Sequence, residues 1–251
     1  MRSIIVAGNW KMNMDPQSGA RLAAGILKGL EKKPAGCVVI LFPPSVTIPA
    51  VVETVEGSQI GVGGQNLYFE ESGAFTGEIS AGMLKGAGCG YVLVGHSERR
   101  HIFGEDSELL ARKLRAALDS GLAPVLCVGE LLDQRESGDA EKVVRDQLGG
   151  VLEGIDDREL TRVMIAYEPV WAIGTGKTAT PEDAASMHAV IREWISSSFG
   201  DDAAEEMTIM YGGSVKPHNA ATLLSEQEID GALVGGASLE AASFLDIIRS
   251  V

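Results

Sequence analysis

The chain has 251 residues, 45% of them hydrophobic and 22% charged, and 35 acidic residues against 21 basic ones give a formal net charge of −14 at pH 7. This apolar fraction excludes a disordered chain, and the length suits either two ordinary domains or one large α/β barrel. The acidity argues against binding to nucleic acids, to anionic membranes and, at first sight, to a small anionic substrate.

Short runs of apolar and β-branched residues recur along the chain, and most are continuous rather than alternating. Strands that are buried on both faces have this pattern. We expect strands at residues 4–7, 37–42, 59–62, 91–94, 123–128, 163–166, 207–211 and 232–234. Between them, helical spacing and good helix formers predict helices that include 16–32, 107–120, 140–152, 181–199 and 239–250. Thr180 followed by Pro181 is a typical helix start.

The spacing of these runs corresponds to strand–helix units of about 31 residues, which is close to the usual size of such a unit. A doubly wound open sheet is one possible arrangement. Polar residues or glycines follow most of the strands, as in Gly95-His96 and Glu168-Pro169. A ring of polar strand ends favours a closed (β/α)8 barrel. No shift in composition divides the chain, so we predict a single α/β barrel domain over residues 1–251.

The sequence also bears on location and metals. No segment reaches the ~20 apolar residues of a membrane-spanning helix, and the N-terminus lacks the apolar core of a secretory signal. Cys37, Cys89 and Cys127 are widely separated and form no CxxC pair. This pattern favours a reducing compartment, and we predict a cytoplasmic protein. The four histidines show no HExxH spacing, so no metal site is predicted.

Two short motifs that would indicate other chemistries are incomplete. Residues 174–178 (GTGKT) end like a phosphate-binding P-loop, but Trp171 stands where that loop requires its first glycine. Residues 95–99 (GHSER) resemble a nucleophile elbow, but Arg99 replaces the final glycine. Neither nucleotide binding by a P-loop nor serine hydrolase chemistry is therefore favoured.

Five longer blocks are complete, and they resemble those of the triosephosphate isomerases. They are residues 7–13 (AGNWKMN), 94–100 (VGHSERR), 166–177 (AYEPVWAIGTGK), 211–215 (YGGSV) and 230–239 (DGALVGGASL). The blocks occur in family order and span nearly the whole chain. The resemblance implies a TIM barrel that interconverts dihydroxyacetone phosphate and D-glyceraldehyde 3-phosphate through an enediolate, without a cofactor or a metal.

The resemblance assigns catalysis to Glu168 as the base and His96 as the electrophile at the carbonyl. A single carboxylate can remove a proton from one carbon and return it to the next. If the residues after His96 open a helix, the positive end of that helix would lower the histidine pKa and keep the ring neutral. Lys11 is expected to stabilise developing negative charge, with Glu98 orienting it and Asn9 in polar contact nearby.

A phosphate site is implied as well, and it should consist mostly of backbone N–H groups. The residues assigned to it are Gly174, Ser214, Gly235 and Gly236. Residues 169–177 resemble the mobile lid of the family, which closes over the phosphate and excludes water.

The loop from Phe69 to Glu78 carries two phenylalanines and no helix signal. An exposed aromatic loop usually has a partner, and the resemblance implies a homodimer in which this loop inserts into a second subunit near residues 9–13.

Two alternative functions are those of other phosphate-binding barrel enzymes and of an inactive barrel that only binds ligand. None of the apolar runs contains the lysine that a Schiff-base aldolase needs, and a metal-dependent epimerase would need a His/Asp cluster that is absent. The presence of Glu168, His96 and Lys11 disfavours an inactive barrel.

Overall fold

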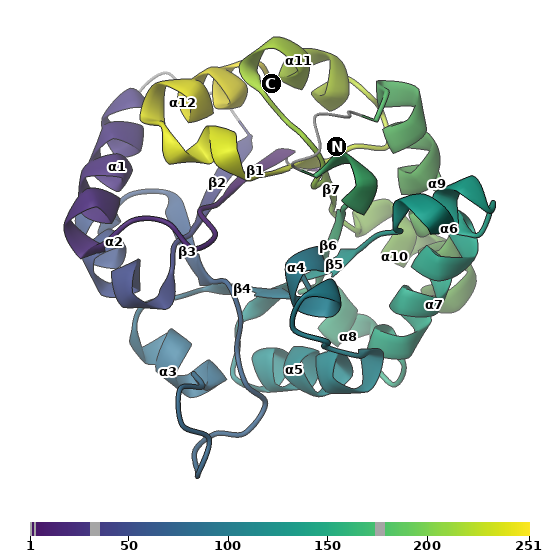
Figure 1. The fold of residues 1–251 in the computed structure, drawn as a ribbon, viewed down its shortest axis with the longest axis horizontal. Helices are drawn as coiled ribbons and strands as arrows, with labels where there is room; N and C mark the ends of the chain where they lie inside the picture. The colour runs from purple at the N-terminus through teal and green to yellow at the C-terminus, as the bar shows by residue number, and fades with distance from the viewer. Residues whose placement is uncertain (1, 3, 31–35, 174–178) are drawn as a thin grey trace.

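The structure is a computed structural model, which describes residues 2, 4–30, 36–173 and 179–251. Parallel strands follow one another in chain order around a closed barrel, and β8 pairs with β1 to complete the ring (Figure 1). The strands are β1 (Ile4–Asn9), β2 (Cys37–Phe42), β3 (Ile60–Gly64), β4 (Tyr91–Val94), β5 (Ala123–Val128), β6 (Met164–Tyr167), β7 (Ile209–Tyr211) and β8 (Gly231–Val234). The predicted barrel is thus confirmed, and the open doubly wound sheet is excluded.

Helices form an outer ring around the barrel (Figure 1). The longer ones are α1 (Pro16–Gly29), α2 (Ile48–Val55), α5 (Ser107–Asp119), α7 (Ala140–Leu152), α9 (Pro181–Phe199), α11 (Pro217–Leu224) and α12 (Ala241–Arg249). The shorter ones are α3 (Ala81–Gly86), α4 (Ser97–His101), α6 (Leu132–Glu136), α8 (Asp157–Leu160) and α10 (Asp201–Glu206). Short 3₁₀ turns in the described part of the chain include η2 (Ser45–Thr47), η3 (Val170–Ala172) and η4 (Gly236–Leu239).

Side chains along each strand alternate between two apolar cores. In β1, Ile5 and Ala7 belong to an inner core whose buried members all come from strands, including Phe42 of β2. Val6 points the other way, into an outer core that it shares with residues of the helices such as Leu22. Both faces of each strand are therefore buried, which explains why the strands read as continuous apolar runs.

The predicted strands agree with the observed ones to within two residues at each end. The helices predicted at 140–152 and 181–199 match α7 and α9 residue for residue. The Oγ1 atom of Thr180 accepts a hydrogen bond from the Asp183 N–H at 3.1 Å, which confirms the helix start. Helix α12 begins two residues later than expected, because η4 occupies the chain up to Leu239. Helix α1 ends at Gly29, before the undescribed residues 31–35.

All the strands are parallel, so their carboxyl ends and the loops that follow them lie at one end of the barrel. The loop from Phe69 to Glu78 forms no helix and projects beyond the helical ring between β3 and α3 (Figure 1). An isolated β-bridge between Tyr68 and Ser80 joins the two ends of this loop. Within the described ranges, no helix combines the length and the apolar composition that crossing a membrane requires.

Candidate active site

A cavity of about 570 Å³ opens at the carboxyl end of the barrel. Its lining brings together residues that follow five different strands, and seven of the eight site residues predicted from the sequence are among them: Asn9, Lys11, His96, Glu168, Ser214, Gly235 and Gly236. The eighth, Gly174, lies outside the described residues. Segments more than 200 residues apart in the chain thus meet in one cavity because the barrel is closed.

Glu168 and His96 are in direct contact at this end of the barrel. Glu168 follows β6, and its N–H donates to the Val128 carbonyl at 2.8 Å, which fixes its backbone to β5. Its side chain is almost completely buried. One carboxylate oxygen, Oε1, lies 2.9 Å from His96 Nε2, and the other, Oε2, accepts the Ser97 N–H at 2.8 Å. The carboxylate is therefore held by two donors that come from the chain after β4.

His96 is the N-cap of helix α4, which begins at Ser97, so the residues after His96 do open a helix as the sequence suggested. Its Nδ1 atom accepts a hydrogen bond from the Glu98 N–H at 3.2 Å. A ring nitrogen that accepts a hydrogen bond carries no proton, so the proton of the neutral ring is on Nε2. Nε2 is the atom that faces Glu168, and the ring is therefore oriented as a hydrogen-bond donor into the cavity.

Opposing influences act on the pKa values of this pair. Burial lowers the pKa of His96, but the carboxylates of Glu168 and Glu98 outweigh burial and raise it above its ordinary value. The expectation that the helix start would lower this pKa is wrong for the observed arrangement, because Glu168 lies against the ring. Burial raises the pKa of Glu168, but His96 and the Ser97 N–H outweigh it and hold the pKa below its ordinary value. Glu168 is thus ionised near neutral pH.

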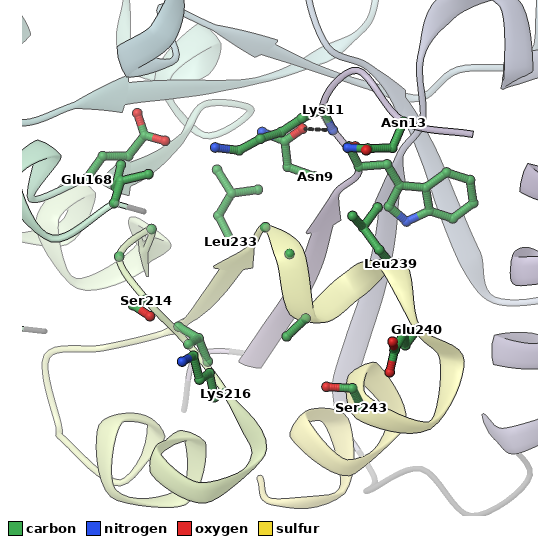
Figure 2. A pocket seen from close by; sticks show the side chains of 18 of the residues that line it. Asn9, Lys11, Asn13, Glu168, Ser214, Lys216, Leu233, Leu239, Glu240 and Ser243 are labelled. Carbon is green, nitrogen blue, oxygen red and sulfur yellow. Dashed lines mark hydrogen bonds between the residues drawn. The ribbon is translucent and has the colours of Figure 1, made fainter. Parts of the chain in front are cut away.

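Lys11 lines the same cavity and extends toward Glu168 (Figure 2). Its Nζ lies 2.6 Å from Glu98 Oε1, which confirms the pairing expected from the sequence. Its backbone N–H donates to Asn9 Oδ1 at 3.0 Å, the bond drawn as a dashed line in Figure 2. Lys11 is not a glycine, yet its φ is 51°, a left-handed conformation that costs energy and persists only when neighbours enforce it.

Gln65 is one of the neighbours that enforce this conformation. Its side-chain Nε2 donates to the Lys11 carbonyl and to the Phe42 carbonyl, at 2.8 Å each. The amide therefore ties the loop after β1 to the end of β2. Gln65 is one of the polar residues that follow the strands, and the sequence predicts no role for it, because the two carbonyls that it joins are distant from it in the chain.

Two glycines allow the backbone and side chain of Glu168 to occupy this position. A Cβ atom at Gly212 would lie 2.8 Å from Glu168 Cγ, and one at Gly129 would lie 1.7 Å from the Glu168 carbonyl oxygen. Any larger residue would displace Glu168 at either position. The sequence placed these glycines at strand ends, where they read equally well as ordinary turns.

The end of the cavity opposite His96 is formed by Ser214 after β7 and by Gly235 and Gly236 after β8. Figure 2 shows Ser214 below Glu168 on the same side of the cavity, with Lys216 beyond it. The Ser238 N–H and hydroxyl both donate to the Gly235 carbonyl, at 2.8 and 2.7 Å, and so shape the turn η4. Two glycines and a serine in turns thus line this part of the cavity, where the absence of a glycine Cβ allows close approach to the backbone.

The segment after Glu168 is anchored through the buried carboxylate of Glu130. Trp171 Nε1 donates to Glu130 Oε1 at 2.8 Å, and the Tyr167 hydroxyl donates to both carboxylate oxygens at 3.1 Å. The Val170 N–H also donates to the Glu130 carbonyl at 3.1 Å. The remainder of the expected lid, residues 174–177, falls among the undescribed residues. From the sequence, Glu130 is expected only as a polar residue just after β5, in a segment (residues 127–130) that gives structural support, and the groups that it binds were not predicted.

The described residues contain no group of three or more His, Cys, Asp or Glu side chains placed to bind a metal ion. What the cavity does offer is an ionised carboxylate, an imidazole N–H, an ammonium group and a turn-lined end. This combination suits the removal of a carbon-bound proton next to a carbonyl in an anionic molecule.

Comparison with known proteins gives a consistent result. A family model described as "Triosephosphate isomerase" matches residues 4–251. The triosephosphate isomerase of Rhodopirellula baltica is 53% identical over 249 residues, which cover 99% of this chain and 98% of that protein. Those of Roseiflexus castenholzii and Chloroflexus aurantiacus are each 50% identical, over 253 and 249 residues, and cover 99% of this chain and 98% and 99% of their own lengths.

Proposed function

The chain belongs to the triosephosphate isomerase family, and from this premise we propose how its side chains divide the reaction. The protein interconverts dihydroxyacetone phosphate and glyceraldehyde 3-phosphate. We assign proton transfer to Glu168, polarisation of the carbonyl to His96 and stabilisation of negative charge to Lys11. The observation that carries this assignment is the contact between the Glu168 carboxylate and the His96 ring in a cavity that Lys11 also lines.

Glu168 removes the proton from the carbon next to the substrate carbonyl. The electron pair of that C–H bond forms the carbon–carbon double bond of an enediolate, and the carbonyl electrons move onto the oxygen. His96 Nε2 gives its proton to this oxygen and takes up the proton of the neighbouring hydroxyl. The oxygen of that hydroxyl forms the new carbonyl as Glu168 returns its proton to the neighbouring carbon. Glu168 is suited to both steps because it is ionised, and because its side chain can reach two adjacent carbons by a small rotation.

His96 donates from Nε2 to the oxygen that becomes negative. The Glu98 N–H occupies Nδ1, so the ring keeps its proton on the nitrogen that faces the cavity. When Glu168 leaves the ring to approach the substrate, the carboxylate that raises the His96 pKa moves away. Burial and the positive end of α4 then favour the neutral ring, which is the form that donates without carrying a charge.

Lys11 places a fixed positive charge beside the same oxygens, with Asn9 in polar contact nearby. A cation stabilises the enediolate more than the neutral carbonyl, so its effect is larger in the transition state than in the ground state. The ion pair with Glu98 and the bonds from Gln65 and Asn9 hold the lysine in place before the substrate arrives. This preorganisation avoids the cost of reorienting the side chain during the reaction.

The substrate phosphate is bound by backbone N–H groups of Ser214, Gly235 and Gly236, and of Gly174 in the undescribed part of the lid. The inference from the net charge of −14 against a small anionic substrate is wrong, because the substrate is a phosphate ester. Net charge is an average over the whole surface, and charges more than ~10 Å away are screened at 0.1 M salt. A few local donors therefore decide what the cavity binds.

The enzyme is a homodimer in this proposal. Large apolar side chains are exposed on the loops that follow four neighbouring strands, β1 to β4. They are Met12, Val46, Phe75, Ile102 and Phe103. Because neighbouring strands end side by side, these residues share one edge of the barrel, and the projecting loop from Phe69 to Glu78 lies there too (Figure 1). An apolar surface of this kind supports a contact with a second copy near residues 9–13.

We place the enzyme in the cytoplasm and expect it to bind neither nucleic acid nor membranes. The support is the acidity of the chain and its three cysteines, which are buried and widely separated in the sequence. We also expect activity without a cofactor. All the residues with proposed roles belong to the same barrel. We therefore propose that residues 1–251 form a single domain.

The proposal is tested by a coupled assay of triose phosphate interconversion in EDTA, with Lys11→Met as the variant and Lys28→Met as its control. Lys28 is exposed in the last turn of α1, so its charge is lost without touching the cavity. Wild type and Lys28→Met should be fully active in EDTA, whereas Lys11→Met should lose at least about 100-fold in kcat/KM. Loss of wild-type activity in EDTA, or an active Lys11→Met, would contradict the assignment.

A further inference from the structure

The loop between β7 and α11 carries Ser214, and few backbone hydrogen bonds hold it. At one end, the Gly212 N–H donates to the Tyr167 carbonyl at 2.7 Å. At the other end, the Lys216 carbonyl accepts the first hydrogen bonds of α11, from the N–H groups of Asn219 and Ala220. Between these points, Gly213, Ser214 and Val215 form no backbone–backbone hydrogen bond within the described part of the chain. The loop therefore needs another support.

The side chain of Asn219 supplies that support through both of its polar atoms. Its Nδ2 donates to the Ser214 carbonyl at 3.0 Å, and its Oδ1 accepts the Lys216 N–H at 2.7 Å. The two partners lie two residues apart, so the side-chain amide of Asn219 bridges the loop across Val215. We call this pair of hydrogen bonds the Asn219 clamp. The NH₂ group of the amide donates and its oxygen accepts, as the chemistry of an amide requires.

Asn219 is itself fixed, which is what a clamp requires. It lies in the first turn of α11, and the neighbouring Ala220 packs into the core of the barrel, as do Leu223 and Leu224 further along the helix. The Val215 side chain is buried as well, so the loop cannot easily lift away. Movement of the Ser214 peptide groups relative to the barrel is therefore limited by the position of one helix.

We propose that Asn219 is a positioning residue that orients the Ser214 peptide for the substrate phosphate. This inference rests on the proposed role of Ser214 in phosphate binding. The bond to the Ser214 carbonyl fixes the peptide plane between Ser214 and Val215. The adjoining plane, which carries the Ser214 N–H, can then change its direction only by rotation about the N–Cα and Cα–C bonds of Ser214, so the N–H has fewer orientations. The Ser214 N–H is thus oriented before the substrate arrives, and phosphate binding avoids the entropy loss of ordering the loop.

A purely structural role is the alternative, because Asn219 also caps α11 through the Lys216 N–H. The two roles differ in what they change. Loss of a cap lowers stability and affects all substrates alike. Loss of the clamp weakens binding of the phosphate group and leaves chemistry on a substrate without phosphate unaffected. Asp156 offers a matched control, since its side chain caps α8, which precedes β6 and so lies at the opposite end of the barrel.

The experiment compares wild type, Asn219→Ala, Asn219→Ser and Asp156→Ala. For each, the melting temperature, the Ki of inorganic phosphate as a competitive inhibitor, and kcat/KM for glyceraldehyde 3-phosphate and for unphosphorylated D-glyceraldehyde are measured. The serine variant keeps a short polar group in case the alanine variant folds poorly, but its hydroxyl cannot bridge both partners.

Both Asn219 variants should raise the Ki of phosphate by about 3- to 10-fold, the size of one weakened hydrogen bond, with kcat/KM for D-glyceraldehyde unchanged. Asp156→Ala should lower the melting temperature alone. An unchanged Ki in both Asn219 variants, or equal losses on both substrates, would overturn the clamp while leaving the proposed function intact. A wild-type enzyme that inorganic phosphate does not inhibit would instead overturn the phosphate site, and the clamp with it.

Discussion

The stability of the barrel should depend on pH through His188, a histidine that the reaction does not use. His188 lies on α9 and is completely buried against the rings of Tyr167 and Tyr211. Its Nδ1 bonds to the Glu228 carbonyl at 3.1 Å, and its Nε2 has no hydrogen-bond partner among the described residues. A proton added to Nε2 would therefore be a buried, unpaired charge, and burial lowers the pKa of His188 to about 4.

The sign of the effect follows from where the unfolded chain titrates. A histidine in the unfolded chain has a pKa near 6.5, so between pH 6.5 and pH 4 the unfolded chain binds more protons than the folded one. This contribution to stability is present above pH 6.5 and is lost as the pH falls through this window. The full difference in pKa corresponds to about 3 kcal/mol, of which about 2 kcal/mol is lost by pH 5.

Urea unfolding of wild type and His188→Gln at pH 7.5 and at pH 5 measures this contribution. The protein concentration is kept constant, because dimerisation would otherwise change the apparent stability. Glutamine is neutral at both pH values, so other titrating groups cancel in the comparison. Wild type should lose about 2 kcal/mol more than the variant between the two pH values. Equal losses would refute the argument that His188 is buried in its neutral form.

Three further predictions concern the site and its surroundings. Glu168→Gln should lower the pKa of His96 in an NMR titration, because it removes the carboxylate that raises it; an unchanged or higher pKa would contradict the pairing. Gly212→Ala should reduce kcat by at least about 10-fold by displacing Glu168, whereas Gly86→Ala, which meets no neighbour, should not. Phe103→Glu should shift the enzyme toward monomers in sedimentation, and an unaltered dimer would locate the interface elsewhere.

The strands were predictable because both of their faces are buried. Val6 and Ala7 point into different cores, yet both must be apolar, so the sequence carries an unbroken signal at each strand. The short helices were harder to predict. Helix α3 has six residues and α8 only four, too few for a helical period to stand out from the surrounding loops. Their starts depend on single capping side chains such as Ser80.

The site residues were predictable as a set, because the family blocks that contain them follow the strands directly. The pKa shifts of these residues and the contacts that hold them in place were not predictable. The direction of the His96 pKa depends on Glu168, 72 residues away in the chain, lying 2.9 Å from its ring. The roles of Gln65 and Asn219 were equally invisible, since each depends on backbone carbonyls and N–H groups that every residue possesses. Spacing in the sequence identifies which residue types are present, but not which backbone groups they meet.

The central claim is that the Glu168 carboxylate moves the proton, and the turnover of Glu168→Asp tests it most directly. The shorter side chain keeps the charge but withdraws the carboxylate by one methylene, about 1.5 Å, from the position that wild-type Glu168 can reach. The account predicts a variant that remains folded by circular dichroism but has a kcat at least about 100-fold below wild type. A folded Glu168→Asp enzyme with a kcat near that of wild type would contradict it.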